Sequence, residues 1–332
     1  MQKLIEGFTR QLADALKIGS TFEMERPGRD IRNVMLAGMG GSGIGANLIE
    51  SLTFDRIPFP ISICKGYEIP RFVDPHTLFI ASSYSGNTEE VLEAVNKARL
   101  KRANIIVITS GGKLLEIAEA NNYPVFKVPS GSDSPRANIG YMMLGLLFVF
   151  YQAGLIGAAF IKETENAIDY LNRGVKAIQT EAEILARRLK GKFPIIYSGP
   201  RMAAMATRFQ QQLNENAKQL AHVNTFPEMN HNEIVGWKFP EHLFQHAQVI
   251  CLYSDYDNER VEKRMEICWD IFEKKSGTPI DIVAQGASLL EEYFYLIHLT
   301  DWITFYLAKE NHVDVNAIDN INFLKNELSK IK

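Results

Sequence analysis

Cysteine is scarce in this sequence, which has only Cys64, Cys251 and Cys268 among its 332 residues. Three widely spaced cysteines provide neither a disulfide framework nor the paired spacing of a zinc site. This scarcity argues against a small secreted protein held together by disulfides. We therefore expect the chain to work in the reducing cytoplasm.

An excess of basic residues is also missing, because the formal net charge is −3 and no stripe of lysine and arginine is visible. This balance argues against nucleic acid as the main partner. The first residues, Met1–Lys3, open a polar amphipathic segment and do not resemble a signal peptide.

Charge is missing altogether from residues 137–161, a stretch long enough to cross a bilayer. The alternative is a buried helix over Ile139–Gln152 that ends at Gly154, with a second helix beginning near Ala158. We favour the buried helix, because glycines break the run and no basic cluster flanks it. A membrane is therefore not expected as a partner.

Short apolar runs alternate with amphipathic helical segments along most of the chain. This alternation predicts an α/β fold in which helices cover both faces of a parallel sheet. The pattern restarts after a charged helical stretch at residues 161–190, which predicts two domains, 1–153 and 154–332. The expected strands are residues 33–37, 61–65, 78–82, 105–109, 125–128, 194–198, 249–253 and 279–283.

Two segments, Gly38–Gly45 and Ser82–Glu90, each follow an expected strand and open an expected helix. Backbone N–H groups at such a turn favour an anion, and glycines allow its close approach. The first segment also matches a dinucleotide-binding pattern, but the next strand ends in Lys65 rather than the acidic residue that holds a ribose. A purely structural turn there, and ordinary helix capping by Asn87 or Thr88 with Glu90 in the second segment, remain alternatives. Four hydroxyl side chains around Gly86 favour a phosphate site.

These two segments resemble the sugar isomerase (SIS) domain family. The chain is more narrowly similar to the bifunctional phosphoglucose/phosphomannose isomerases, because three further blocks match: Ser134–Ala137, Gln212–Lys218 and Pro227–Glu233. The resemblance covers almost the whole chain and implies two SIS-type, flavodoxin-like domains. It also implies that phosphate is bound by Gly41, Ser42, Ser83, Ser85 and Thr88.

Isomerising an aldose to a ketose needs a base near C1 and C2, a positive charge near the enediolate and an acid to open the sugar ring. Glu215 is the candidate base, since it lies towards the end of an expected helix between two asparagines. Arg136 opens the apolar helix and needs a negative partner, which is either a carboxylate or the enediolate. His231 is a loop histidine that could titrate near neutral pH.

The resemblance supports Glu215, His231, Arg136 and Lys325 as the catalytic residues, and it implies a homodimer in which His231 enters the partner's site. We expect no cofactor and no metal, because a proton transfer through an enediol needs no metal. His242 and His246 have the spacing of metal ligands on a helix, although a surface helix beginning after Pro240 explains them more simply.

One departure from the family pattern is Asn316-Ala317, where dual-specificity relatives tend to have Thr-Pro. It places the reaction of mannose 6-phosphate in more doubt than that of glucose 6-phosphate. A non-catalytic SIS-domain sensor of sugar phosphates is the competing hypothesis, but such a sensor would not need Glu215, Arg136 and His231 together.

Overall fold

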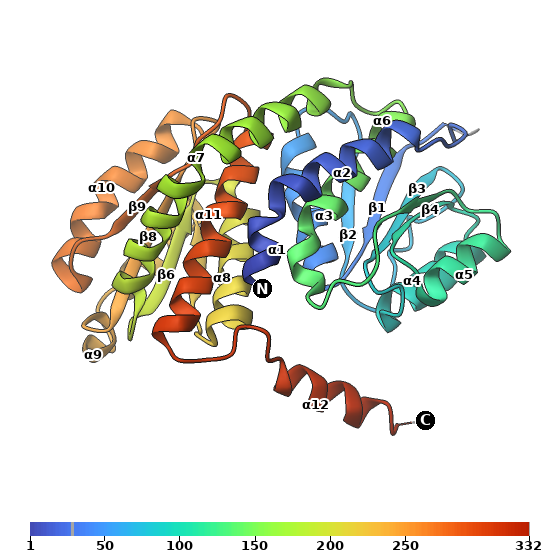
Figure 1. Cartoon of the computed structure of the whole chain (residues 1–332). Helices are drawn as coiled ribbons and strands as arrows, with labels where there is room; N and C mark the ends of the chain where they lie inside the picture. The colour runs from blue at the N-terminus through green and yellow to red at the C-terminus, as the bar shows by residue number, and fades with distance from the viewer. Residues whose placement is uncertain (28–29, 332) are drawn as a thin grey trace. The chain divides into compact units, whose positions relative to one another are not determined.

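The computed structural model of the chain describes residues 1–27 and 30–331, which form two compact units (Figure 1). The N-terminal unit comprises Lys3–Arg173 and Gly286–Tyr295. The C-terminal unit comprises Met1–Gln2, Gly174–Gln285 and the chain from Leu296 onwards. The contacts change from one unit to the other inside helix α7 (Ala159–Leu189). The domain boundary at residue 153, just before this helix, remains a prediction.

The N-terminal unit is built on a parallel five-stranded sheet in the order β2-β1-β3-β4-β5. Apolar residues of β1, β3 and β4 pack against α4 and α5 on one face, and Phe79 and Val107 are fully buried in this core. The elements of this unit, besides the first part of α7, are α1 (Gln2–Glu6), α2 (Phe8–Thr21), β1 (Asn33–Ala37), α3 (Gly40–Thr53), β2 (Ile61–Cys64), β3 (Thr77–Ser83), α4 (Glu89–Leu100), β4 (Asn104–Thr109), α5 (Gly112–Ala120), β5 (Val125–Lys127), η1 (Pro135–Asn138) and α6 (Ile139–Gln152).

The strand order creates a topological switch point in this sheet. Strands β1 and β3 are neighbours, with Ala37 paired to Ala81, although β2 lies between them in sequence. Ligands of open α/β sheets bind where the chain leaves the strands on opposite sides of such a point. The two segments expected to bind phosphate follow β1 and β3 and therefore lie at the carboxyl ends of these two strands.

The charge-free stretch forms the buried helix α6, as expected, because every residue from Ile139 to Phe150 is buried. Gln11 on α2 fixes its first turn: the Gln11 amide accepts a hydrogen bond from Gly140 N at 2.6 Å and donates one to the Ala137 carbonyl at 2.9 Å. Among the described residues, no helix is long and apolar enough to cross a membrane.

The C-terminal unit has a parallel four-stranded sheet in the order β7-β6-β8-β9. Its core is rich in aromatic rings, and Tyr197 stacks on Phe272 with 4.9 Å between ring centroids. The elements, besides the end of α7, are β6 (Phe193–Ser198), η2 (Pro200–Met202), α8 (Ala203–Ala217), β7 (His222–Thr225), η3 (Glu228–His231), η4 (Glu233–Gly236), α9 (Glu241–Phe244), β8 (Ala247–Tyr253), α10 (Glu259–Ser276), β9 (Ile280–Val283), α11 (Leu289–Glu310) and α12 (Asp319–Leu328).

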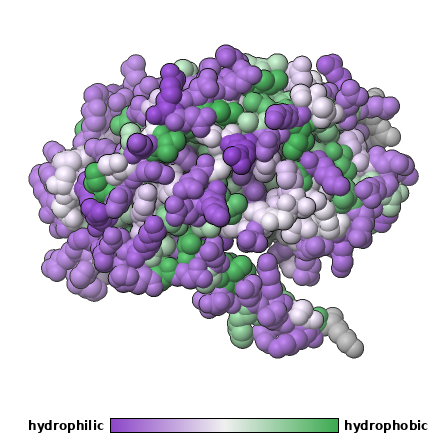
Figure 2. Space-filling model, viewed as in Figure 1, coloured by the Kyte–Doolittle hydropathy of each residue, from purple (hydrophilic) through white to green (hydrophobic). Residues whose placement is uncertain are grey.

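The expected fold of two parallel sheets flanked by helices is confirmed. Hydrophilic residues cover most of the face drawn in Figure 2, as expected when most apolar side chains are buried in the core of each unit. Strand β7 is the main element that the sequence pattern does not reveal: all four of its residues are only partly buried, so they form no apolar run.

Candidate active site

The turn between β1 and α3 depends on its glycines. Gly40 has a φ of +51°, and a Cβ atom on Gly43 would lie 2.6 Å from the Gly38 carbonyl oxygen. A Cβ atom on Gly41 would come within 3.3 Å of the Arg136 Cα atom. Ser42, in the first turn of α3, is buried. The turn thus brings the helix N-terminus and the backbone of Arg136 close together.

The turn between β3 and α4 is organised by hydroxyl groups. The Ser83 hydroxyl lies 2.8 Å from the Thr88 hydroxyl and also accepts a hydrogen bond from Gly86 N at 3.2 Å. Thr88 is the N-cap residue of α4, but its side chain makes no capping hydrogen bond. The Ser85 hydroxyl accepts from Asn87 N at 3.3 Å, and Ser85 is exposed. Ordinary capping therefore does not account for these hydroxyls.

A third turn, which the sequence reasoning missed, supports the serine turn from behind. Gly86 has a φ of +66°, and a Cβ atom there would lie 1.7 Å from the Gly111 carbonyl oxygen. Leu114 N donates to the Gly86 carbonyl, and Lys113 N donates to the Asn87 side chain. The sequence signal was Ser110-Gly111-Gly112, where a strand passes into a helix as in the other two turns.

Arg136 lies in the short helix η1 that leads into α6, and its side chain is half-buried. The backbone of Arg136 lies against Gly41. Arg136 is therefore at the carboxyl end of the sheet, as are Ser42 and the turn between β3 and α4. The expected phosphate-binding residues and one expected catalytic residue therefore lie together at the carboxyl end of the sheet of the N-terminal unit.

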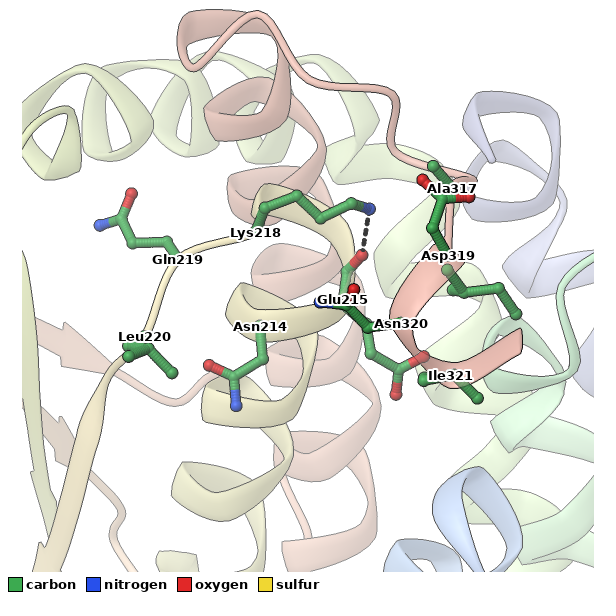
Figure 3. Close-up of a pocket in the computed structure, with 10 residues that line it drawn as sticks. Asn214, Glu215, Lys218, Gln219, Leu220, Ala317, Asp319, Asn320 and Ile321 are labelled. Carbon is green, nitrogen blue, oxygen red and sulfur yellow. Dashed lines mark hydrogen bonds between the residues drawn. The ribbon is translucent and has the colours of Figure 1, made fainter. Parts of the chain in front are cut away.

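Glu215 lines a pocket of about 440 Å³ within the C-terminal unit. The pocket lies between the end of α8 and the start of α12, and the half-buried Glu215 side chain extends towards the first turn of α12 (Figure 3). The lining residues are Asn214, Glu215, Lys218, Gln219, Leu220, Ala317, Ile318, Asp319, Asn320 and Ile321.

Lys218 is a lining residue that the sequence reasoning assigned no role. It has a left-handed backbone, with a φ of +56°, and it ends α8. Its ammonium group donates to the Glu215 backbone carbonyl at 2.6 Å, which suits the negative end of a helix dipole. The sequence signal for Lys218 was its place in the Gln212–Lys218 block, one of the blocks that match the isomerase family.

A row of buried polar side chains holds α8 to α11. Arg208 pairs with both carboxylate oxygens of Asp301, at 2.9 and 3.0 Å, and Gln212 donates to Asp301 at 2.7 Å. One turn further on, Asn216 donates to the Thr304 hydroxyl at 3.0 Å. These residues recur every four positions on one face of α8, and Asn216 is the immediate neighbour of Glu215. The row therefore fixes the helix end that carries the candidate base.

The other two expected catalytic residues lie elsewhere in the C-terminal unit. His231 ends the short helix η3 and is exposed, and Lys325 lies on α12, where every residue from Ile321 to Leu328 is exposed. Neither residue lines the pocket of Glu215. The structure thus brings Glu215 together with Lys218 but not with His231 or Lys325.

Two other carboxylates near His231 could be considered as bases. Glu233 accepts hydrogen bonds from Tyr197, His222 and Asn224. Burial alone would raise its pKa, but these three donors outweigh burial and lower the pKa to about 2. Glu228 is exposed and accepts from Asn232 at 3.0 Å. A carboxylate that accepts three hydrogen bonds is a poor proton acceptor, so Glu233 is not a good base.

No group of three or more potential metal ligands from histidine, cysteine, aspartate and glutamate occurs among the residues that the structure describes. The short helix α9 begins directly after Pro240 and contains His242. The helix ends at Phe244, so His246 lies outside it.

Residues 178–328 match the family described as the bacterial phospho-glucose isomerase C-terminal SIS domain. The chain is 38% identical to the bifunctional phosphoglucose/phosphomannose isomerase of Caldicellulosiruptor bescii, with 100% of both chains covered. It is 33% identical to the isomerase of that name from Aquifex aeolicus, with 99% of this chain and 98% of the relative covered.

Among solved structures, the C-terminal domain of glucosamine-fructose-6-phosphate aminotransferase from Francisella tularensis aligns with a TM-score of 0.74 and 15% identity. The alignment covers 95% of this chain and 97% of that one, and at this identity it shows the fold alone. The full-length relatives show more: this chain belongs to the family of bifunctional phosphoglucose/phosphomannose isomerases.

Proposed function

We propose that this protein is an aldose–ketose isomerase that interconverts glucose 6-phosphate and fructose 6-phosphate through a cis-enediol. The observation that carries this proposal is the half-buried Glu215 carboxylate, which lines a pocket in a chain that is 38% identical to a named isomerase over its full length. A sensor of sugar phosphates would have no need of a carboxylate at this position.

The proton transfer assigned to Glu215 balances without an external reagent. The carboxylate removes the C2 proton of the open-chain aldose, and the electron pair of the C–H bond forms the C1–C2 double bond while O1 gains a proton. Glu215 then returns a proton to C1 as O2 loses its own proton and becomes the ketose carbonyl. Because no electrons enter or leave, the reaction needs no cofactor, and a general base supplies about 10²–10⁴-fold acceleration.

We assign binding of the substrate phosphate to Gly41, Ser42, Ser83, Ser85 and Thr88. Two helix N-termini without side-chain caps, those of α3 and α4, support this assignment, because their first amides have no partner within the helix. The hydroxyl pair Ser83–Thr88 adds donors beside them. Arg136, held against Gly41, is assigned to the negative charge of the enediolate.

Ring opening is assigned to His231 as acid and base, with Lys325 at the ring oxygen. Both residues are exposed in the single chain. We propose that the protein is a homodimer in which His231 serves the partner's active site, since an exposed loop can reach a neighbouring subunit.

The three cysteines of the chain are buried as free thiols, which supports placing the protein in a reducing cytoplasm.

Mannose 6-phosphate would form the same enediol, because it differs from glucose 6-phosphate only at C2. Ala317, the residue at the departure from the family pattern, lines the pocket of Glu215. We expect the space that Ala317 leaves in this pocket to decide whether both epimers react.

A coupled assay of fructose 6-phosphate formation tests the proposal. Purified protein is given glucose 6-phosphate or mannose 6-phosphate, with and without EDTA. Turnover that survives EDTA supports isomerisation by side chains alone. Binding of sugar phosphate without any turnover would instead support the sensor.

A further inference from the structure

A polar cluster in the C-terminal unit has no part in the proposed function. The Glu233 carboxylate, on η4, accepts from the Tyr197 hydroxyl at 2.5 Å and from His222 Nε2 at 2.9 Å, and also from the Asn224 amide. Tyr197 lies on β6 and the other two donors lie on β7. One carboxylate therefore ties its loop to two adjacent strands.

The cluster continues into the core. Tyr197 is fully buried, and its hydroxyl accepts from Trp237 Nε1 at 3.0 Å while it donates to Glu233. Trp237 stacks on Phe244 with 5.1 Å between ring centroids. The Glu233 end of the loop is thus attached to the hydrophobic core and not merely to the surface.

This loop, Phe226–Trp237, is the segment that carries His231. Phe226 and Trp237 are buried at its two ends. Within the loop, Asn230 is held from α10: its amide donates to Cys268 Sγ at 3.3 Å and its oxygen accepts from Arg264 at 3.3 Å.

His231 therefore lies between two fixed side chains, Asn230 directly before it and Glu233 two residues after it. Asn232, between His231 and Glu233, accepts from Glu233 N at 2.6 Å and donates to Glu228 at 3.0 Å. Side-chain hydrogen bonds hold Asn230 and Glu233 on the two sides of His231, while His231 itself is exposed.

We infer that Glu233 is the positioning residue of His231, fixing the histidine's loop against β6 and β7 through Tyr197, His222 and Asn224. This inference rests on the proposed function, because it matters only if His231 takes part in ring opening. Glu233 itself touches no reacting atom. Its carboxylate accepts hydrogen bonds from three donors, which suits an anchor and not a proton acceptor.

Glu233→Gln tests the inference, because a glutamine has one acceptor oxygen where the cluster offers three donors. A catalytic group displaced by about 1 Å can lose as much as 10²-fold in rate. We expect kcat for glucose 6-phosphate to fall about tenfold or more, with KM changed by less than about twofold. Glu241→Gln, at an exposed position on α9, is the matched control and should leave both constants unchanged.

A double-mutant cycle separates positioning from general destabilisation. If Glu233 acts through His231, Glu233→Gln should cost almost nothing further in a His231→Ala background. An equal cost in both backgrounds would overturn the inference, as would a Glu233→Gln enzyme with wild-type kcat or a His231→Ala enzyme with wild-type kcat. The proposed function fails separately, since in that case the wild-type protein itself shows no turnover.

Tyr197→Phe provides a second route should Glu233→Gln fail to fold. It removes one donor to Glu233 and keeps the aromatic ring in the core. The same cycle with His231→Ala should again give a fall in kcat that disappears when the histidine is absent. Equal costs in both backgrounds would overturn the inference here too.

Discussion

The hydroxyl groups of Ser83 and Thr88 lie 2.8 Å apart across the turn between β3 and α4. They come from the two sides of Gly86, whose N–H donates to Ser83. Thr88 occupies the N-cap position without capping the helix. The contact between the two hydroxyls and the Gly86 N–H shapes the turn, while the first amides of α4 and the hydroxyl proton that is not used between Ser83 and Thr88 remain as donors for a ligand.

Gly86→Ala should therefore disable this turn. A methyl group there would meet the Gly111 carbonyl oxygen at 1.7 Å, and the residue has a positive φ. We expect stability to fall by about 1–3 kcal/mol and KM for sugar phosphate to rise at least several-fold. Thermal unfolding and steady-state kinetics measure the two effects.

Gly157→Ala is the matched control for this change, because a Cβ atom at Gly157 has nothing within 4 Å. It should alter neither quantity. A Gly86→Ala protein with wild-type KM would remove the serine turn from substrate binding.

Breaking the buried ion pair between α8 and α11 should be costly. Arg208 is 2% exposed and Asp301 is 6% exposed, and Arg208→Ala would leave the Asp301 carboxylate buried without its cation. Loss of one partner of such a pair costs about 3–5 kcal/mol. Urea unfolding of the variant measures this loss.

Lys263→Ala breaks the exposed pair with Glu266 and should change stability little. Similar small losses in both variants would show that the row on α8 does not fix the helix that carries Glu215.

The pair His222–Glu233 predicts a pH dependence of stability. The hydrogen bond with Glu233 raises the pKa of His222 above its usual value of 6.5. The histidine's stabilising contribution should then be complete below about pH 6.5 and should be lost as the pH rises through the higher, folded-state pKa. Glu233 behaves oppositely: its contribution is present above about pH 4.5 and is lost as the pH falls towards 2.

Urea unfolding from about pH 5 to pH 9 measures the histidine's part of this profile. His222→Gln should remove the decline that wild-type protein shows above about pH 6.5. His242→Gln, at an exposed site on α9, should keep that decline. Identical profiles for wild type and His222→Gln would mean that the ion pair contributes nothing to folding.

The proposed sharing of His231 between subunits predicts complementation. Glu215→Gln and His231→Ala should each keep only a small residual activity, but a hybrid dimer would have one site with both residues intact. Random pairing makes about half of all dimers hybrid, so about a quarter of wild-type activity should return after mixing and refolding. No recovery, despite demonstrated subunit exchange, would mean that His231 serves its own chain's site or has no catalytic role.

Much of the fold could be predicted from the sequence because its apolar runs are long and regularly spaced. Helix α6 is an example: in an uncharged stretch broken by Gly154 and Gly157, the expected bounds Ile139–Gln152 are those that the structure shows. Strand β7 could not be predicted, because His222–Thr225 is half-buried and mostly polar and so forms no apolar run. Its side chains His222 and Asn224 bond Glu233, a residue outside the strand that a local sequence pattern does not identify as their partner.

The candidate site was predictable where a motif coincides with a strand-to-helix turn, as at Ser42 and Ser83. The buried side-chain hydrogen bonds that support the site could not be predicted. The bond of Asn216 to Thr304 joins residues 88 positions apart, and no local pattern predicts which distant side chain satisfies a buried amide. Lys325 shows the reverse case: the motif suggests a role, while the side chain is exposed on α12.

The most direct test of the account is the turnover of Glu215→Gln with glucose 6-phosphate that carries deuterium at C2. Wild-type protein should form fructose 6-phosphate with a primary isotope effect and with deuterium transferred to C1 or lost to water. The variant should still bind the sugar phosphate, because the phosphate site is intact, while kcat falls by about 10²–10⁴-fold. Glu241→Gln should behave as wild type. Near-normal turnover by Glu215→Gln would contradict the central claim that this carboxylate moves the proton.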